Sequence, residues 1–110
     1  MNSSVKIIQP SGILDGVAVN SLRHEISNFV EGGTNIVLVD FQDVTFMNSS
    51  GLGALVSTLR VVRSAGAELF VCSLSEQVRM IFELTKMDRV FKMFNSRNEF
   101  EEKVSSVEQA

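Results

Sequence analysis

The sequence predicts an α/β fold, a small mixed sheet of about four to five strands with about four helices packed against it. Short apolar runs rich in β-branched residues alternate along the chain with longer stretches whose apolar residues recur every three or four positions. Strands that alternate with helices favour right-handed crossovers and a largely parallel or mixed sheet. With 110 residues and no internal repeat, we expect one domain, residues 1–110, with its core within about residues 5–107.

The N-terminal part of the chain predicts a strand and a helix. Residues 5–9 are typical of a strand, which Pro10 interrupts because proline has no N–H to donate to a sheet. Extended structure resumes over residues 11–14, and Asp15 is placed to cap a helix. That helix should end at residues 32–33, which are both glycine. Its apolar face comprises Val19, Leu22, Ile26, Phe29 and Val30.

The central part of the chain begins with a strand that we expect to be buried on both faces. Residues 35–41 are mostly apolar and β-branched, and Asp40 is the one charge inside the run. Gln42, Asp43 and Thr45 are expected to form a polar connection. The apolar period then becomes that of a helix over residues 50–64, with the stripe Leu52, Leu55, Val56, Leu59 and Val62.

Asn48 and Ser49 stand where this second helix begins. Asn and Ser side chains accept the free amide hydrogens of a first turn, so capping alone would explain both residues. A serine at a helix N-terminus is also a favourable place for a phosphate, because free amides and the helix dipole attract negative charge. Gly51, Gly53 and Ala54 carry almost no side chain, so another backbone or a partner can approach this helix end closely.

The C-terminal part predicts two further strands and two further helices. Gly66 is expected to end the second helix, and residues 68–72 form a strand. Ser75 caps a third helix, and residues 90–94 form a short last strand. In the third helix Val78, Ile81 and Phe82 face inward, and Leu84 and Met87 extend its apolar surface. Residues 96–99 form a capping box that opens a final helix with the stripe Phe100, Val104 and Val107, after which the tail is expected to fray.

Composition excludes several classes of protein. A net charge of -3 and a pI near 5.1 argue against a sequence-independent nucleic-acid binder, which needs an excess of Lys and Arg. No apolar run approaches the roughly 20 residues of a membrane helix, so we expect no membrane insertion. The first residues lack the features of a signal peptide, so we expect a cytoplasmic protein. Cys72 is the single cysteine and is expected to be a small buried hydrophobe.

The sequence offers no catalytic or metal site. His24 is the single histidine, it falls off the apolar face of the first helix, and no second ligand of its kind accompanies it. The Gly51–Gly53 segment lacks the lysine and the length of a P-loop. No set of residues combines a nucleophile, a base and oxyanion donors. We therefore expect neither an enzyme nor a bound metal or cofactor.

The string Asp43-Val-Thr-Phe-Met-Asn-Ser-Ser-Gly-Leu-Gly53 resembles the signature of bacterial anti-sigma factor antagonists, members of the STAS domain family. The resemblance covers roughly residues 10–94 and implies a STAS fold. It identifies Ser49 with the phosphoacceptor serine and Ser50 with the hydroxyl position beside it, a possible second acceptor. This chain has Asn48 where the family usually has Asp, so a charge beside the acceptor is missing. The Gly-x-Leu-Asp string ending at Asp15 is also similar to the family's, and implies that Asp15 lies close to the acceptor loop.

The resemblance implies a regulatory binding protein that phosphorylation controls. The unmodified form would bind an anti-sigma factor serine kinase and free its sigma factor, and phosphate on Ser49 would weaken that binding until a serine phosphatase removes it. The partner-binding residues would be Asp15, Asn48, Ser50, Gly51, Leu52 and Gly53. Two alternatives remain open: an adaptor subunit of a membrane transport or signalling assembly with no phosphorylation cycle, and a sensor of an anion or nucleotide. The sequence leaves the oligomeric state open between a monomer and a weak dimer.

Overall fold

The structure, a computed structural model, describes residues 5–109, with side chains described up to residue 104. The expected packing of Val107 and the fraying of the tail beyond it lie outside the described side chains. In chain order the elements are β1 (Val5–Ile8), β2 (Ser11–Leu14), α1 (Gly16–Glu31), β3 (Ile36–Asp40), β4 (Asp43–Met47), α2 (Ser49–Ser64), β5 (Glu68–Cys72), α3 (Glu76–Leu84), the 3₁₀ helix η1 (Met87–Arg89), β6 (Lys92–Phe94) and α4 (Arg97–Gln109).

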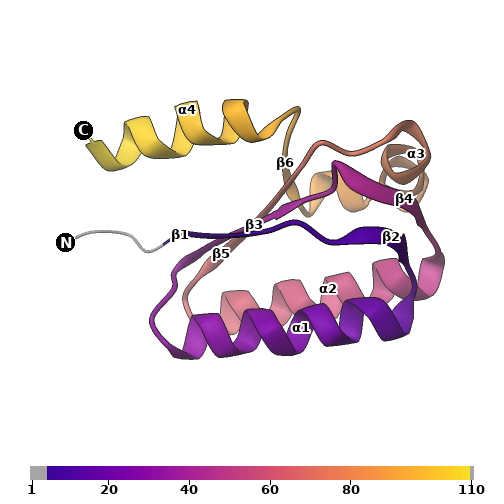
Figure 1. Ribbon diagram of the computed structural model, residues 1–110, viewed down its shortest axis with the longest axis horizontal. Coiled ribbons are helices and arrows are strands. Elements are labelled where there is room, and N and C mark those ends of the chain that lie inside the picture. Colours follow the sequence, from indigo (N-terminus) through magenta and orange to yellow (C-terminus); the bar gives the residue numbers. More distant parts are fainter. Residues whose placement is uncertain (1–4, 110) are drawn as a thin grey trace.

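The strands form two sheets. One has four strands in the order β1-β3-β5-β6, and the other pairs β2 with β4. Helices α1 and α2 lie side by side against one face of the larger sheet, while α4 lies over the opposite face (Figure 1). The α/β class and the packing of four helices around a small sheet are confirmed. Every pairing between the described strands is parallel, because each connection between paired strands crosses over through other elements.

The expectation that Gln42, Asp43 and Thr45 form a polar connection is wrong for all but the first. Asp43–Met47 is the strand β4, which pairs with β2. Of its five residues only two, Val44 and Met47, are buried, so two exposed residues stand in succession and break the alternation that marks a strand in a sequence. The register also shifts, because Gly12 pairs with Val44 and the next residue of β2 pairs with Phe46.

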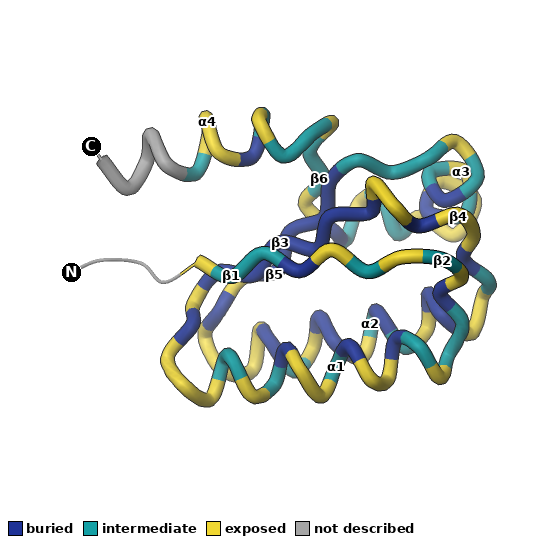
Figure 2. Tube along the Cα trace, viewed as in Figure 1, coloured by how far each residue is buried: buried dark blue, intermediate teal, exposed yellow. Residues whose placement is uncertain are grey.

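The main core lies between the larger sheet and the pair α1–α2. All five residues of β3 are buried, as expected for a strand covered on both faces. Figure 2 shows the buried positions gathered along the sheet and on the helix sides that face it. The helices contribute Val19, Leu22 and Ile26 from α1 and Leu52, Leu55, Leu59 and Val62 from α2. The predicted apolar stripes therefore identify the packing faces of both helices.

A second, smaller cluster fills the space between the sheet and α4. Phe100 is 2% exposed, and its ring centroid lies 5.6 Å from those of Phe70 and Phe94. Cys72 belongs to this cluster as the buried free cysteine that the sequence predicts. Burial raises the pKa of the Cys72 thiol, which keeps it protonated and unreactive.

Helix ends follow the predicted chemistry with one exception. The Ser75 side chain accepts from the Val78 N–H at 3.3 Å, and Gly66 with φ +80° follows the end of α2. The Ser96 hydroxyl accepts from the N–H of Glu99 at 3.1 Å. The exception is Leu84, the last residue of α3, which was expected to extend the apolar surface of this helix but is 75% exposed.

One ion pair ties α4 to the sheet. Arg97 Nη2 lies 3.1 Å from Oδ2 of Asp40, which is buried at the end of β3. The other carboxylate oxygen accepts from the Gln42 N–H at 3.0 Å. Arg97 also donates to Oε1 of Gln9 at 2.6 Å. The one charge inside the central strand is thus matched by the first residue of a helix 57 positions away.

We expect Arg97→Met to lower the free energy of unfolding by about 2–3 kcal/mol, because it leaves the buried Asp40 carboxylate without its cation. Lys92→Met is the matched control, since it breaks a pair with Glu68 in which both side chains are more than half exposed. The control should cost less than about 1 kcal/mol. Urea denaturation of both variants measures the difference, and equal losses would contradict the assigned role of the ion pair.

Candidate functional site

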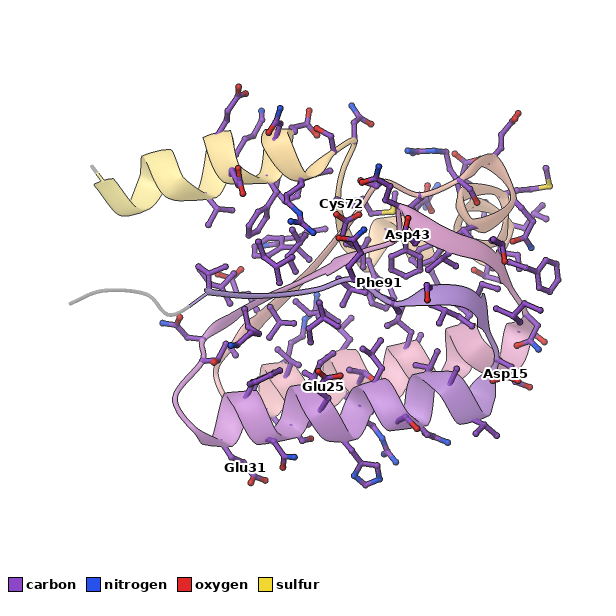
Figure 3. The ribbon with its side chains drawn as sticks, in the orientation of Figure 1. Asp15, Glu25, Glu31, Asp43, Cys72 and Phe91 are labelled. Atoms are coloured by element: carbon purple, nitrogen blue, oxygen red, sulfur yellow. The ribbon has the colours of Figure 1, made fainter. Side chains whose placement is uncertain are left out.

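The starts of α1 and α2 lie side by side and form the candidate site. Each helix has an acceptor at its N-cap: Asp15 Oδ1 accepts from the Ala18 N–H at 2.9 Å, and Asn48 Oδ1 accepts from the Gly51 N–H at 2.8 Å. The parallel pairing of β2 with β4 brings the two caps together, because each cap residue directly follows one of these strands. Figure 3 places Asp15 at this end of the molecule. The expected proximity of Asp15 to the 48–51 segment is therefore present.

The backbone of Leu14 fixes the distance between the two helix starts. The Asn48 N–H donates to the Leu14 carbonyl at 3.4 Å. Gly51 lies directly against the same carbonyl, and a Cβ built on Gly51 would overlap it. At the neighbouring contact, a Cβ on Gly16 would lie 3.4 Å from Cβ of Ser50. The glycine in the first turn of α2 is thus required by a close approach between two backbones.

Gln77 fixes the other side of the loop, a role that the sequence analysis did not predict. The Gln77 side chain accepts from the Met47 N–H at 3.1 Å and donates to the Met47 carbonyl at 3.1 Å. Met47 is the last residue of β4 and is fully buried. The first turn of α3 therefore fixes the backbone one residue before the Asn48 cap. A glutamine in a helical turn carries no local signal for a contact 30 residues away.

Ser49 and Ser50 are both exposed, as first and second residues of α2. The Asn48 cap occupies the N–H of the third residue, so the amides of the two serines receive no cap from any described side chain. Asn48 and Asp15 are half-buried beside them. Two helix dipoles that point the same way concentrate positive potential at these hydroxyls, while the Asp15 carboxylate adds one negative charge nearby.

Two of the predicted partner-binding residues cannot present a side chain to a partner. Leu52 is 5% exposed and belongs to the main core, and Gly51 is buried against Leu14. Their position on the inner side of α2 explains this, because a helix turns these two residues toward the sheet. Gly53 is exposed, with open space where its Cβ would be. The surface around the serines is therefore formed by Asp15, Asn48, Ser50 and Gly53.

Four large apolar residues on the elements next to this surface are exposed, and we call them the apolar rim: Ile13, Val17, Phe46 and Met80, which are 61%, 77%, 43% and 54% exposed. Ile13 and Phe46 are register partners on β2 and β4. Val17 is in the first turn of α1, and Met80 lies one turn after Gln77 on α3. Exposed large apolar residues on neighbouring elements are typical of a protein-binding surface.

The described residues contain no group of His, Cys, Asp and Glu that could hold a metal ion. His24 is exposed on α1, away from the helix starts. Within residues 5–109, no helix has both the length and the apolar character to cross a bilayer. What the helix starts offer chemically is two accessible hydroxyls in a positive field.

Comparisons with known proteins identify one domain family. The STAS domain model matches residues 1–100. The anti-sigma-B factor antagonist of Staphylococcus aureus is 30% identical over 78 residues, which are 71% of this chain and 72% of that protein. TM1081 of Thermotoga maritima, a provisionally assigned anti-sigma factor antagonist, is 26% identical with a TM-score of 0.83, over 92% of this chain and 87% of its own.

More distant structures share the fold. Unphosphorylated SpoIIAA, an anti-sigma factor antagonist of Bacillus, is 23% identical with a TM-score of 0.69, over 97% of this chain and 92% of its own. The STAS domain of a SulP transporter from Vibrio cholerae is 10% identical with a TM-score of 0.78, over 100% of this chain and 88% of its own. At these identities the likeness concerns the fold alone.

We expect Gly51→Ala to destabilise the protein by about 2–3 kcal/mol, because the added methyl group meets the Leu14 carbonyl and the two helix starts must separate. Gly53→Ala makes the same chemical change two residues later in open space. It should be neutral or stabilising by up to about 1 kcal/mol through helix propensity. Thermal or urea denaturation compares the two, and a similar effect of both substitutions would exclude the close-approach argument.

We expect Gln77→Ala to cost about 1–3 kcal/mol, because it leaves the buried N–H and carbonyl of Met47 without partners. Amide hydrogen exchange should also accelerate across residues 47–50. Glu76→Ala, at the exposed neighbouring position, is the control and should leave that exchange unchanged. If the two variants exchange alike at residues 47–50, Gln77 does not hold the loop.

Proposed function

The chain belongs to the STAS domain family, and from that premise we propose that it is an anti-sigma factor antagonist whose binding is controlled by phosphorylation of Ser49. Its curated relatives carry the names of regulators rather than of enzymes. The observation that carries the proposal is the exposure of Ser49 at the first position of α2. A kinase active site can reach this hydroxyl without unfolding any element.

In the unmodified form, the surface around Ser49 binds an anti-sigma factor serine kinase, which then releases its sigma factor. The apolar rim supplies the contact area, and Asp15, Asn48, Ser50 and Gly53 supply the polar centre. Gly53 leaves room for the partner's backbone because nothing beyond its own helix turn lies within 4 Å of where its Cβ would be. Apolar contacts around a small polar centre fit the usual composition of a reversible protein interface.

Phosphorylation acts on the interface rather than on the fold. A phosphate on Ser49 lies at a helix N-terminus, where the dipole and the uncapped amides of Ser49 and Ser50 favour its charge. The modified protein therefore stays folded. In the complex, the same dianion is removed from water without a partner of opposite charge, which is costly. Switching binding from nearly complete to nearly absent requires about 5.5 kcal/mol of differential affinity, and a buried charge clash contributes several kcal/mol.

Ser50 is the neighbour of the acceptor and the second candidate hydroxyl. It contacts the start of α1, since its Cβ lies 3.4 Å from a Cβ position on Gly16. Ser49 is exposed at the first position of α2, so we assign the phosphate to Ser49 and a contact with the partner to Ser50. A serine phosphatase reverses the modification. Asn48 retains the cap that Asp would provide, since its Oδ1 accepts from the Gly51 N–H at 2.8 Å.

A second candidate function is that of an adaptor subunit in a membrane transport or signalling assembly without a phosphorylation cycle. Asn48 favours it, because the charge usual in the family beside the acceptor is absent. The two functions differ in one measurable property. After incubation with ATP and cell extract, the intact mass rises by one phosphate located at Ser49 if the switch operates. An unchanged mass together with a co-purifying membrane ATPase supports the adaptor.

We expect Ser49→Ala to bind the kinase without regulation by ATP, and Ser49→Asp to bind at least about tenfold more weakly than the parent protein. Ser50→Ala removes the neighbouring hydroxyl and is the control, which should still accept phosphate at Ser49. Calorimetry with the kinase, in the presence and absence of ATP, measures both properties. If the alanine and aspartate variants at residue 49 both bind like the parent, the proposed switch does not exist.

A further inference from the structure

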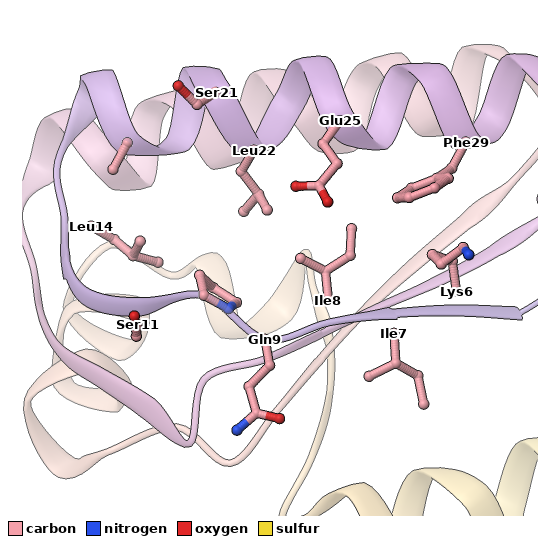
Figure 4. Close-up of a pocket in the computed structure, with 12 residues that line it drawn as sticks. Lys6, Ile7, Ile8, Gln9, Ser11, Leu14, Ser21, Leu22, Glu25 and Phe29 are labelled. Carbon is pink, nitrogen blue, oxygen red and sulfur yellow. The ribbon is translucent and has the colours of Figure 1, made fainter.

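The outer edge of β1 is unpaired within the described part of the chain. β1 is the terminal strand of the four-stranded sheet and pairs on one side with β3. An open cleft of about 450 Å³ runs along it, between β1–β2 and α1. Figure 4 shows Lys6 and Ile8 pointing from the strand into this cleft, while Ile7 points to the opposite face. An unpaired edge beside a cleft is a template for adding another strand.

Charges of both signs line this cleft. Glu25 projects from α1 and points toward Ile8, and the structure gives its carboxylate no partner within the described residues (Figure 4). Lys6 lies with its ammonium 4.5 Å from the ring centroid of Phe29 and forms no ion pair with a residue that the structure describes. The ammonium of Lys6 and the carboxylate of Glu25 therefore lie beside the same edge, one on β1 and the other on α1. A second copy of the same edge, running antiparallel, would present them in reversed order.

We propose that the β1 edge is a site of self-association, in which two copies of the chain pair their β1 strands antiparallel about a two-fold axis at Ile7. In such a pair, residues directly opposite each other point to the same face of the sheet, so the two-fold axis must pass through a residue. Near the middle of the strand this leaves three registers, centred on Lys6, Ile7 or Ile8. Centring on Lys6 would oppose two ammonium groups. Centring on Ile8 would place Lys6 opposite Pro10, which has no N–H to donate.

Centring on Ile7 avoids both problems and pairs the charges. Lys6 of each copy then lies opposite Ile8 of the other copy, where Glu25 points. A two-fold axis makes this contact twice, so the edge is complementary to itself. The pairing involves β1 alone, whereas Ser49 and the apolar rim belong to β2, β4, the helix N-termini and α3. A short strand pair with two ion pairs fits a weak dimer whose population depends on concentration.

Sedimentation equilibrium on the whole chain, from about 1 µM to about 1 mM at low salt, tests the proposal. We expect a reversible dimer, and we expect Glu25→Lys to raise its dissociation constant at least about tenfold because the repulsion acts at two symmetric contacts. Glu31→Lys is the matched control: it makes the same charge change on the same helix, at an exposed position outside the cleft (Figure 3). It should leave the dissociation constant unchanged.

The exchanged pair Lys6→Glu with Glu25→Lys should restore the dimer that each single substitution weakens. Circular dichroism melting confirms that each variant is folded. In the parent protein, amide exchange at residues 5–9 should slow as concentration rises. A monomer throughout the concentration range would overturn the proposal. So would a dimer that is indifferent to Glu25→Lys, or one that the exchanged pair fails to restore.

Discussion

The contact between Gly51 and the Leu14 carbonyl is the constraint on which the rest of the site depends. It joins the end of β2 to the first turn of α2 at a distance that only a glycine permits. The same carbonyl accepts the Asn48 N–H, so one backbone group fixes both the cap and the helix that follows. Because β2 also leads directly into α1, this contact sets the two helix starts side by side. Their dipoles then act on the same two exposed hydroxyls.

The site is rigid on its inner side and open on its outer side. Leu14 and Gln77 hold the backbone of the loop from two directions, through hydrogen bonds to Asn48 and Met47. The exposed side consists of serine hydroxyls and the apolar rim, which make no contribution to the core. The phosphorylation that we propose at Ser49 would therefore change what the surface binds while the scaffold keeps its geometry. This separation of scaffold from surface is what a reversible protein switch requires.

Different interactions fix α4 on the opposite face of the sheet. α4 packs on the small aromatic cluster around Phe70 and Phe100 and is oriented by the Arg97–Asp40 ion pair. A charge at the end of a buried strand is costly unless its partner and its hydrogen bonds are all in place. Here the Gln42 N–H and the guanidinium complete the shell of Asp40. The pair therefore specifies where α4 begins more than it adds stability.

The sequence by itself determined the elements whose signals are local. The caps at Asp15, Asn48 and Ser75, the buried strand over residues 36–40 and the apolar stripes of α1 and α2 all depend on residues within a few positions of one another. Only the tertiary structure decided the strand β4, the close approach of Gly51 to the Leu14 carbonyl, and the hydrogen bonds of Gln77 to Met47. These depend on partners about 30 residues or more apart, and a short sequence window contains no information about which distant backbone will lie beside it.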